Sequence, residues 1–247
     1  VVRNDEEKTR RLCTVGYAVA LEHQEVGHFK QAADELRSWL AAHSDDAAAH
    51  AHLAHVLSLD KQDDAAWSSL ITAEALDATS PIVQRTQARL LLKRQQTDAA
   101  FEAAKSAWTS DQNDPENLLI LAATMGAKGH IDKAATMVEL ALSARPHYAE
   151  AFAVRAQLSL RAGASDKALA DFEAALNLKP HLIQLWPIVA TLRYQRRDLA
   201  GAIAALDSAL KHEPDNVAHL VNLGEFKRQA GAIDDAVMLL GKAVAMD

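Results

Sequence analysis

The stretch "DKALADFEAALNLKP" at residues 166–180 decides the fold, because similar stretches stand 34 residues before it and 34 residues after it. These read "IDKAATMVELALSARP" at 131–146 and "LAGAIAALDSALKHEP" at 199–214. The same spacing extends in both directions without a gap. A fixed period of this length is typical of an array of small structural units, each packed on its neighbours.

Three positions of the repeating unit hold small residues, when residue 13 is counted as position 1. Position 27 is alanine in every unit except the first, which has Trp39. Small residues at fixed positions predict the points at which two helices cross closely. Position 20 is Ala32, Ala66, Ala100, Ala134, Ala168, Ala202 and Ala236, and position 8 is Ala20, Ala54, Ala88, Ala122, Ala156, Ala190 and Gly224.

The residues between these columns predict where helices begin and end. Glycine at position 15 suits a left-handed helix end, and aspartate at position 18 suits a helix start. Proline at position 32 predicts the end of the second helix. Each unit therefore reads as two helices with short turns and no room for a strand. The residues are Gly27, Gly129, Gly163 and Gly231; Asp64, Asp98, Asp132, Asp166 and Asp234; and Pro146, Pro180 and Pro214.

This pattern resembles the tetratricopeptide repeat family, whose 34-residue signature contains spaced aromatic residues, alanines and a closing proline. The best match is 149–182, which carries Phe152, Ala156, Ala168, Phe172, Ala175 and Pro180. The resemblance implies an all-α solenoid, a right-handed superhelix of seven helix–turn–helix units. Their expected bounds are 13–46, 47–80, 81–114, 115–148, 149–182, 183–216 and 217–247, after a charged flank at 1–12 that extends the first helix.

The early units depart from the family pattern. The first unit has Gly16 at position 4, and the third has Gln84 and Gln87 where bulky apolar residues belong. The last unit stops at position 31 without the polar helix that usually closes such an array. We therefore expect the native protein to continue past residue 247, or the open end to associate with a second copy.

The composition excludes several classes of function. A net charge of −7 argues against binding a nucleic-acid backbone, and the single Cys13 excludes an internal disulfide framework. No apolar run approaches the roughly 18 residues of a membrane span. The sequence predicts a soluble chain, in the cytoplasm or, if a signal peptide was removed, in the periplasm. It contains no glycine-rich phosphate loop, catalytic triad or paired carboxylates.

The stretch "AHAHLAHVL" at 49–57 raises the question of a metal site. In the repeat, His50 falls at position 4, where the family packs its helices, whereas His52 and His55 fall at positions 6 and 9, on or near the inner face. Two imidazoles leave a zinc ion short of its usual four ligands. We therefore predict no metal and no cofactor.

A binding surface is the more concrete expectation. In the family, positions 2, 5, 9, 12 and 13 line the inner face, so Arg85 and Arg89 would lie there, one helical turn apart, next to His52 and His55. Arginine suits carboxylate recognition, and this basic stretch predicts a groove for an acidic peptide. The alternative is a solvated helix face with local salt bridges. The family's lysine–asparagine pattern for a terminal carboxylate is absent.

Five further residues complete the predicted inner face: Leu119, Gln157, Tyr194, Asn222 and Arg228. The arginines in "RYQRRD" at 193–198 admit a nucleic-acid interpretation, which the acidic charge opposes. The predicted function is a non-enzymatic scaffold that binds a peptide or a partner helix. The alternatives are the recruiting region of a larger enzyme, such as a glycosyltransferase, and a part of a bacterial envelope or polysaccharide-export complex.

Overall fold

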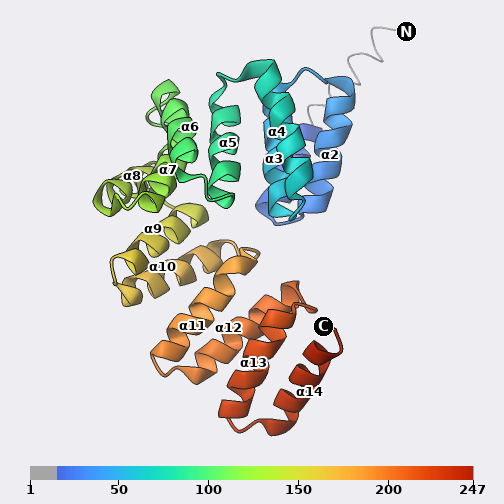
Figure 1. The fold of residues 1–247 in the computed structure, drawn as a ribbon, viewed down its shortest axis with the longest axis vertical. Coiled ribbons are helices and arrows are strands. Elements are labelled where there is room, and N and C mark those ends of the chain that lie inside the picture. Colours follow the sequence, from blue (N-terminus) through green and yellow to red (C-terminus); the bar gives the residue numbers. More distant parts are fainter. Residues whose placement is uncertain (1–15, 247) are drawn as a thin grey trace. The chain divides into compact units, whose positions relative to one another are not determined.

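The computed structural model describes residues 16–246, which form helices joined by short turns and contain no strand (Figure 1). The all-α repeat solenoid predicted from the sequence is confirmed. The predicted helical extension at 1–12 and Cys13 lie outside the described residues. Residues 16–25 are helical, followed by α2 (Phe29–Ala42), α3 (Ala47–Leu59), α4 (Asp63–Asp77), α5 (Pro81–Lys93), α6 (Thr97–Ser110), α7 (Pro115–Ala127), α8 (Ile131–Ala144), α9 (Ala149–Arg161), α10 (Ser165–Leu178), the 3₁₀ turn η1 (Ile183–Leu185), α11 (Trp186–Gln195), α12 (Leu199–His212), α13 (Val217–Gln229) and α14 (Ile233–Val244).

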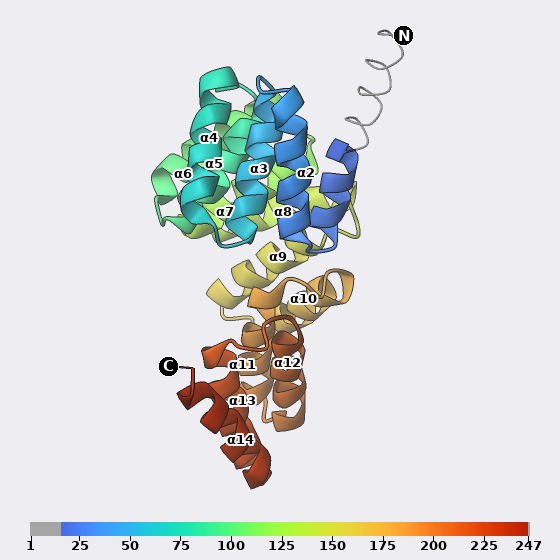
Figure 2. The same ribbon diagram turned by 90° about the vertical axis from the view of Figure 1, so that its right-hand side faces the viewer.

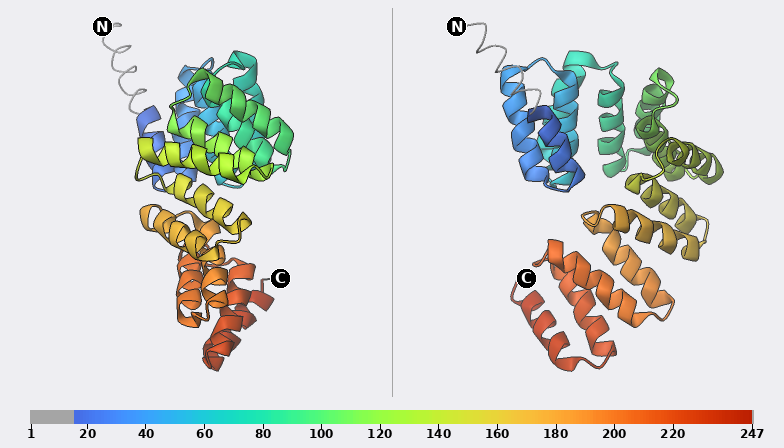
Figure 3. Two further views of the ribbon diagram at one scale, coloured as in Figure 1. Left: turned by 90° about the vertical axis from the view of Figure 1, so that its left-hand side faces the viewer. Right: turned by 180° about the vertical axis from the view of Figure 1, so that it is seen from behind.

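The chain divides into two compact units, Val1–Pro146 and His147–Asp247. In the first unit, drawn from blue to green in Figure 2, the pairs α3–α4, α5–α6 and α7–α8 are helical hairpins, and α5 contacts both α3 and α7. In the second unit the hairpins are α9–α10, α11–α12 and α13–α14, the last shown in red in Figure 3. Within each unit every hairpin therefore packs mainly on its sequence neighbours.

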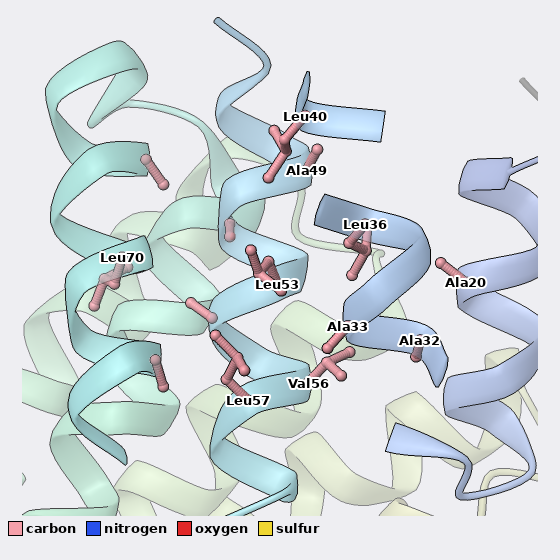
Figure 4. Packing of buried hydrophobic residues seen from close by; sticks show 14 of the residues in the cluster. Ala20, Ala32, Ala33, Leu36, Leu40, Ala49, Leu53, Val56, Leu57 and Leu70 are labelled. Carbon is pink, nitrogen blue, oxygen red and sulfur yellow. The ribbon is translucent and has the colours of Figure 1, made fainter. Parts of the chain in front are cut away.

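The predicted small-residue columns lie at the helix crossings. Every alanine of position 20 is at most 2% exposed, and those of positions 8 and 27 are at most 3% exposed. Figure 4 shows Ala20, Ala32 and Ala33 between neighbouring helices, with Leu36 and Leu53 filling the space between them. In the last hairpin, a Cβ atom on Gly224 would come within 2.8 Å of Leu240. Short side chains thus set the close approach of the helices.

A left-handed residue recurs every 34 residues at the turn inside each hairpin. The predicted glycines have φ values between +75° and +85°. The three units without glycine adopt the same geometry at Lys61, Gln95 and Arg197, with φ between +60° and +63°. Tertiary packing imposes this turn even where a side chain disfavours it, at a local cost of about 1 kcal/mol.

The helix ends follow the predicted signals, with one exception. α8, α10 and α12 end two residues before Pro146, Pro180 and Pro214. The exception is α11, which is preceded by the short turn η1 and contains Pro187 in its first turn. Proline has no N–H to donate, so it fits only the first turn of an α-helix, which explains why α11 begins late.

Candidate functional site

Arg85 lies on α5 and is 7% exposed, although the sequence predicts it on an open inner face. One terminal nitrogen, Nη1, donates to Asp114 Oδ2 and to Asn117 Oδ1, both at 3.1 Å. The other, Nη2, lies 3.3 Å from Glu116 Oε2. Arg85 is therefore a buried cation held by the start of α7, and the sequence-based picture of a solvent-facing arginine is corrected.

The start of α7 is itself fixed by hydrogen bonds. Asp114 caps the helix, since its Oδ1 accepts from the backbone N–H groups of Glu116 at 2.7 Å and Asn117 at 3.1 Å. Asn117 Nδ2 donates to the carbonyl oxygens of Ala107 and Asp111, both at 3.0 Å. The acceptors around Arg85 are thus pre-positioned by an N-cap, a common role for aspartate.

Glu116 is shared among three arginines. Arg89 Nη2 lies 3.4 Å from its Oε2, and Arg145 Nη1 lies 4.0 Å from its Oε1, in addition to the contact with Arg85. Burial raises the pKa of the Glu116 carboxyl, but Arg89 and Arg85 outweigh this effect, and the pKa lies below its ordinary value. We call Arg85, Arg89, Asp114, Glu116 and Arg145 the arginine cluster.

The histidines of α3 add less positive charge than the sequence suggests. Burial lowers the pKa of His52 to about 4, with help from Arg85 and Arg89, so this side chain is neutral at pH 7. Its ring meets Tyr17 edge-on at 5.7 Å. His55 is half-buried on the same helix, and His50 places Nε2 3.1 Å from the carbonyl oxygen of Ser44. The basic stretch is thus carried by arginine.

No group of three or more His, Cys, Asp or Glu side chains in residues 16–246 is arranged to hold a metal ion. The carboxylates of Asp114 and Glu116 are paired with arginines instead. The sequence interpretation misses Glu116 and Asp114 as partners of Arg85, although "NDPEN" at 113–117 has the pattern of a helix start. A usable signal is the spacing, because Asp114 and Glu116 stand 29 and 31 residues after Arg85, at the start of the first helix of the next unit.

In the second unit, the predicted residue Tyr194 on α11 stacks on Phe226 of α13, with ring centroids 4.8 Å apart. Its hydroxyl donates to Gln229 Oε1 at 2.9 Å. Tyr194 is nevertheless 41% exposed, and Val221 on α13 is 42% exposed. We call Tyr194 and Phe226 the aromatic surface, a stacked ring pair whose tyrosine is exposed.

The remaining predicted residues differ in accessibility. Arg228 pairs with Glu225 on α13, with nitrogen–oxygen distances of 2.9 and 2.7 Å. Hydrogen bonds from Arg228 and Gln229 lower the pKa of Glu225 to about 2. Gln157 and Asn222 are exposed, whereas Leu119 is buried at 6% exposure, so it is not open to a ligand.

Two of the three arginines of 193–198 are paired with carboxylates of the chain. Arg193 Nε and Nη2 donate to Glu173 Oε1 at 2.9 and 2.7 Å, and Arg196 lies 3.3 Å from Asp166. A phosphate backbone is bound by cations that are available to it. The structure therefore gives the nucleic-acid interpretation no support.

The last helix, α14, exposes apolar side chains at repeat positions whose residues are buried in earlier units. At position 28, Leu40 is 8% and Leu176 is 3% exposed, whereas Val244 is 79% exposed. At position 21, Leu169 is 4% exposed and Val237 is 66% exposed.

In the described part of the chain, no helix is both long and apolar enough to cross a membrane.

The chain is similar to known repeat proteins in sequence and in structure. A family model described as tetratricopeptide repeat matches residues 126–182 and 190–247, and no curated protein matches the sequence. The structure is similar to that reported in "Functional Characterization of Pseudomonas aeruginosa pilF", at 19% identity and a TM-score of 0.60 over 79% of this chain and 89% of the other. TTC0263, a tetratricopeptide repeat protein of Thermus thermophilus, matches at 22% identity and a TM-score of 0.62 over 72% and 96% of the chains.

A third similar structure is the Cut9–Hcn1 hetero-tetramer of the APC/C, at 18% identity and a TM-score of 0.65. This match covers 87% of this chain and 42% of the other. At such identities the likeness shows a shared fold alone, and function has to be argued from the surfaces described above.

Proposed function

Because this chain belongs to the tetratricopeptide repeat family, whose general role is protein–protein interaction, we propose that it is a non-enzymatic scaffold that binds an acidic peptide. The peptide lies along α3, α5 and α7 of the first unit and is held through the arginine cluster. The proposed role is binding and includes no catalytic step.

One observation carries this proposal: three guanidinium groups surround one carboxylate on a protein whose net charge is −7. Arg89 and Arg145 are 25% and 48% exposed in their side chains, so solvent and ligand reach the cluster. Guanidinium groups that a ligand can reach favour an anion, and the planar fork of arginine favours a carboxylate.

The test is fluorescence anisotropy with a labelled hexaglutamate peptide at low ionic strength. Arg89→Ala should weaken binding about tenfold, since one charge-assisted contact is lost. Arg94→Ala is the matched control, because Arg94 ends the same helix, is exposed and packs over Trp67 at 4.0 Å, outside the cluster. Equal affinities of the wild type and both variants would contradict the proposal.

The exposed face of α14 supports a second contact, self-association between two copies of the chain. Ile233, Val237, Met238 and Val244 are 54% to 79% exposed, which is unusual for large apolar side chains on one helix. A Cβ atom on Gly241 would meet nothing within 4 Å, so a second helix can approach there closely.

Sedimentation velocity at increasing protein concentration tests this contact. The chain should shift toward a dimer, and Val237→Glu with Val244→Glu should restore the monomer while leaving the helical circular dichroism unchanged. A chain that sediments as a monomer at several hundred micromolar would overturn the contact.

A further inference from the structure

We propose that Glu116 is an internal competitor, whose carboxylate occupies the place that a partner's carboxylate takes on binding to the arginine cluster. This inference rests on the proposed function and adds to it how the site is regulated and what its ligand presents. The partner supplies a carboxylate that replaces that of Glu116 on Arg89, Arg145 and Nη2 of Arg85.

The first step of the argument is that Arg85 keeps its position without Glu116. Its Nη1 is held by Asp114 and Asn117, both at 3.1 Å, while only Nη2 faces Glu116. The Nε atom is buried and has no hydrogen-bond partner, so Asp114, Asn117 and Glu116 leave part of the donor capacity of this guanidinium unused. Departure of Glu116 would therefore leave a fixed, desolvated donor ready for another carboxylate.

The second step is that Glu116 is the member of the cluster that can leave. Its backbone N–H is held by the Asp114 cap, but its side chain is 34% exposed and attached through rotatable bonds. Its contacts with Arg89 and Arg145, at 3.4 and 4.0 Å, are longer than a well-formed charge-assisted hydrogen bond. A rotation of its side chain toward solvent would open the site without moving a helix.

The third step is that the exchange is close to balanced. One carboxylate leaves three arginines and another takes its place, so the ion pairs inside the cluster are conserved. Binding to the wild type therefore gains from the cluster only the difference between the partner's contacts and the longer contacts that Glu116 makes with Arg89 and Arg145. Removing the internal carboxylate should shift this balance toward the partner, since Arg89 and Nη2 of Arg85 then lose their internal acceptor.

The chain contains a matched position for comparison. Glu150 occupies the same place in the following repeat, position 2, and its Oε1 accepts from Lys179 Nζ at 2.8 Å. Lys179 and Arg145 likewise share position 31, so both repeats pair these two positions. Because Glu150 is paired with a lysine and lies outside the arginine cluster, Glu150→Gln is a suitable control for Glu116→Gln.

The experiment measures binding of two labelled probes by fluorescence anisotropy to the wild-type chain, Glu116→Gln and Glu150→Gln. The first probe is hexaglutamate with an amidated C-terminus, which offers only side-chain carboxylates. The second is hexaglutamine with a free C-terminus, which offers only the terminal carboxylate. Glu116→Gln should bind at least one probe about tenfold more tightly, and the probe that gains identifies the source of the carboxylate.

The outcomes separate this inference from the proposed function. If the wild type binds and Arg89→Ala weakens binding, but Glu116→Gln binds no more tightly, internal competition is wrong and the acidic-peptide site stands. If neither probe binds the wild type or Glu116→Gln, both proposals are overturned. A gain of equal size in Glu150→Gln would also overturn the inference, because it would reflect the loss of any negative charge.

A gain in Glu116→Gln that disappears in the double variant Glu116→Gln with Arg89→Ala would support the inference directly. Thermal unfolding followed by circular dichroism confirms that each variant is folded. Glutamine keeps the size of glutamate and its capacity to accept a hydrogen bond, so Glu116→Gln tests the charge and not the shape of the side chain.

Discussion

The arginine cluster of the first unit and the aromatic surface of the second lie in different copies of the 34-residue repeat. Arg85 and Tyr194 are both on the first helix of their repeat. Both rest on hairpins with buried alanines at position 20 and left-handed turns at position 15. In the first, Arg85 is a buried cation at 7% exposure with partners on α7; in the second, Tyr194 is 41% exposed and is held by stacking. The difference teaches that the repeat fixes the backbone and leaves the chemistry of the inner positions free.

This difference has energetic consequences. A buried charge requires its partners, and removal of one member leaves an uncompensated charge or polar group. An exposed aromatic pair contributes modestly, and its loss leaves groups that water can hydrate. The same helical framework therefore carries one surface that is tied to stability and another that is nearly independent of it.

The largest expected effect follows from removing the buried cation. Arg85→Ala should lower the free energy of unfolding by about 3 kcal/mol, because Asp114 and Asn117 lose their shared donor. Urea denaturation followed by circular dichroism measures it. Arg228→Ala, which removes an exposed arginine paired with Glu225 in the same helix, should leave the midpoint unchanged. Equal losses of unfolding free energy in the two variants would contradict the expected difference between a buried and an exposed arginine.

The shared framework should respond equally in both regions. Ala100→Leu and Ala202→Leu both overpack a helix crossing where the alanine is fully buried, and each should cost about 2 kcal/mol. Lys167→Leu, at an exposed neighbouring position, should cost much less. Differential scanning calorimetry of the three variants would contradict a common framework if only one alanine position were sensitive.

The neutral histidine next to the arginines predicts a dependence on pH. His52 has a folded pKa of about 4, while an unfolded histidine titrates near 6.5. The unfolded state then binds more protons between these values, so stability falls as pH decreases from 6.5 to 4. His52→Gln should remove about 1 to 2 kcal/mol of that decrease. Denaturation at pH 7 and pH 4.5 measures it, and parallel losses in the wild type and the variant would refute the assignment.

The smallest effect is expected at the aromatic surface. Tyr194→Ala should lower the free energy of unfolding by about 0.5 to 1 kcal/mol, through loss of stacking on Phe226 and of the hydrogen bond to Gln229. Tyr194→Phe keeps the ring and should retain most of it. A loss in Tyr194→Ala as large as that in Arg85→Ala would erase the contrast between the two surfaces.

Much of the fold could be predicted from the period of the sequence. Alanines at positions 8, 20 and 27 predict close helix crossings, and they are buried. Glycines at position 15 predict left-handed turns, and they have positive φ. Proline at position 32 predicts helix ends, and the helices stop two residues before it. These features are local or repeat with one spacing, so each unit supports the interpretation of the next.

The predicted binding residues show the limit of this approach. The repeat places Arg85 and Leu119 at positions that line an inner face, yet both are buried in the first unit. The sequence predicts that His52 adds positive charge, yet burial keeps it neutral at pH 7. A position number gives the direction of a side chain from its helix, but burial depends on the side chains of the neighbouring helices.

The sequence by itself determined the all-α repeat, its period, its turns and its small-residue crossings, because these depend on backbone preferences and on side-chain size. Only the tertiary structure decided that Arg85 meets Asp114 and Glu116, residues 29 and 31 positions further along the chain. It also decided that the turns at Lys61, Gln95 and Arg197 are left-handed without glycine. Both outcomes follow from packing, which sets the neighbours of a side chain and can override its local preference.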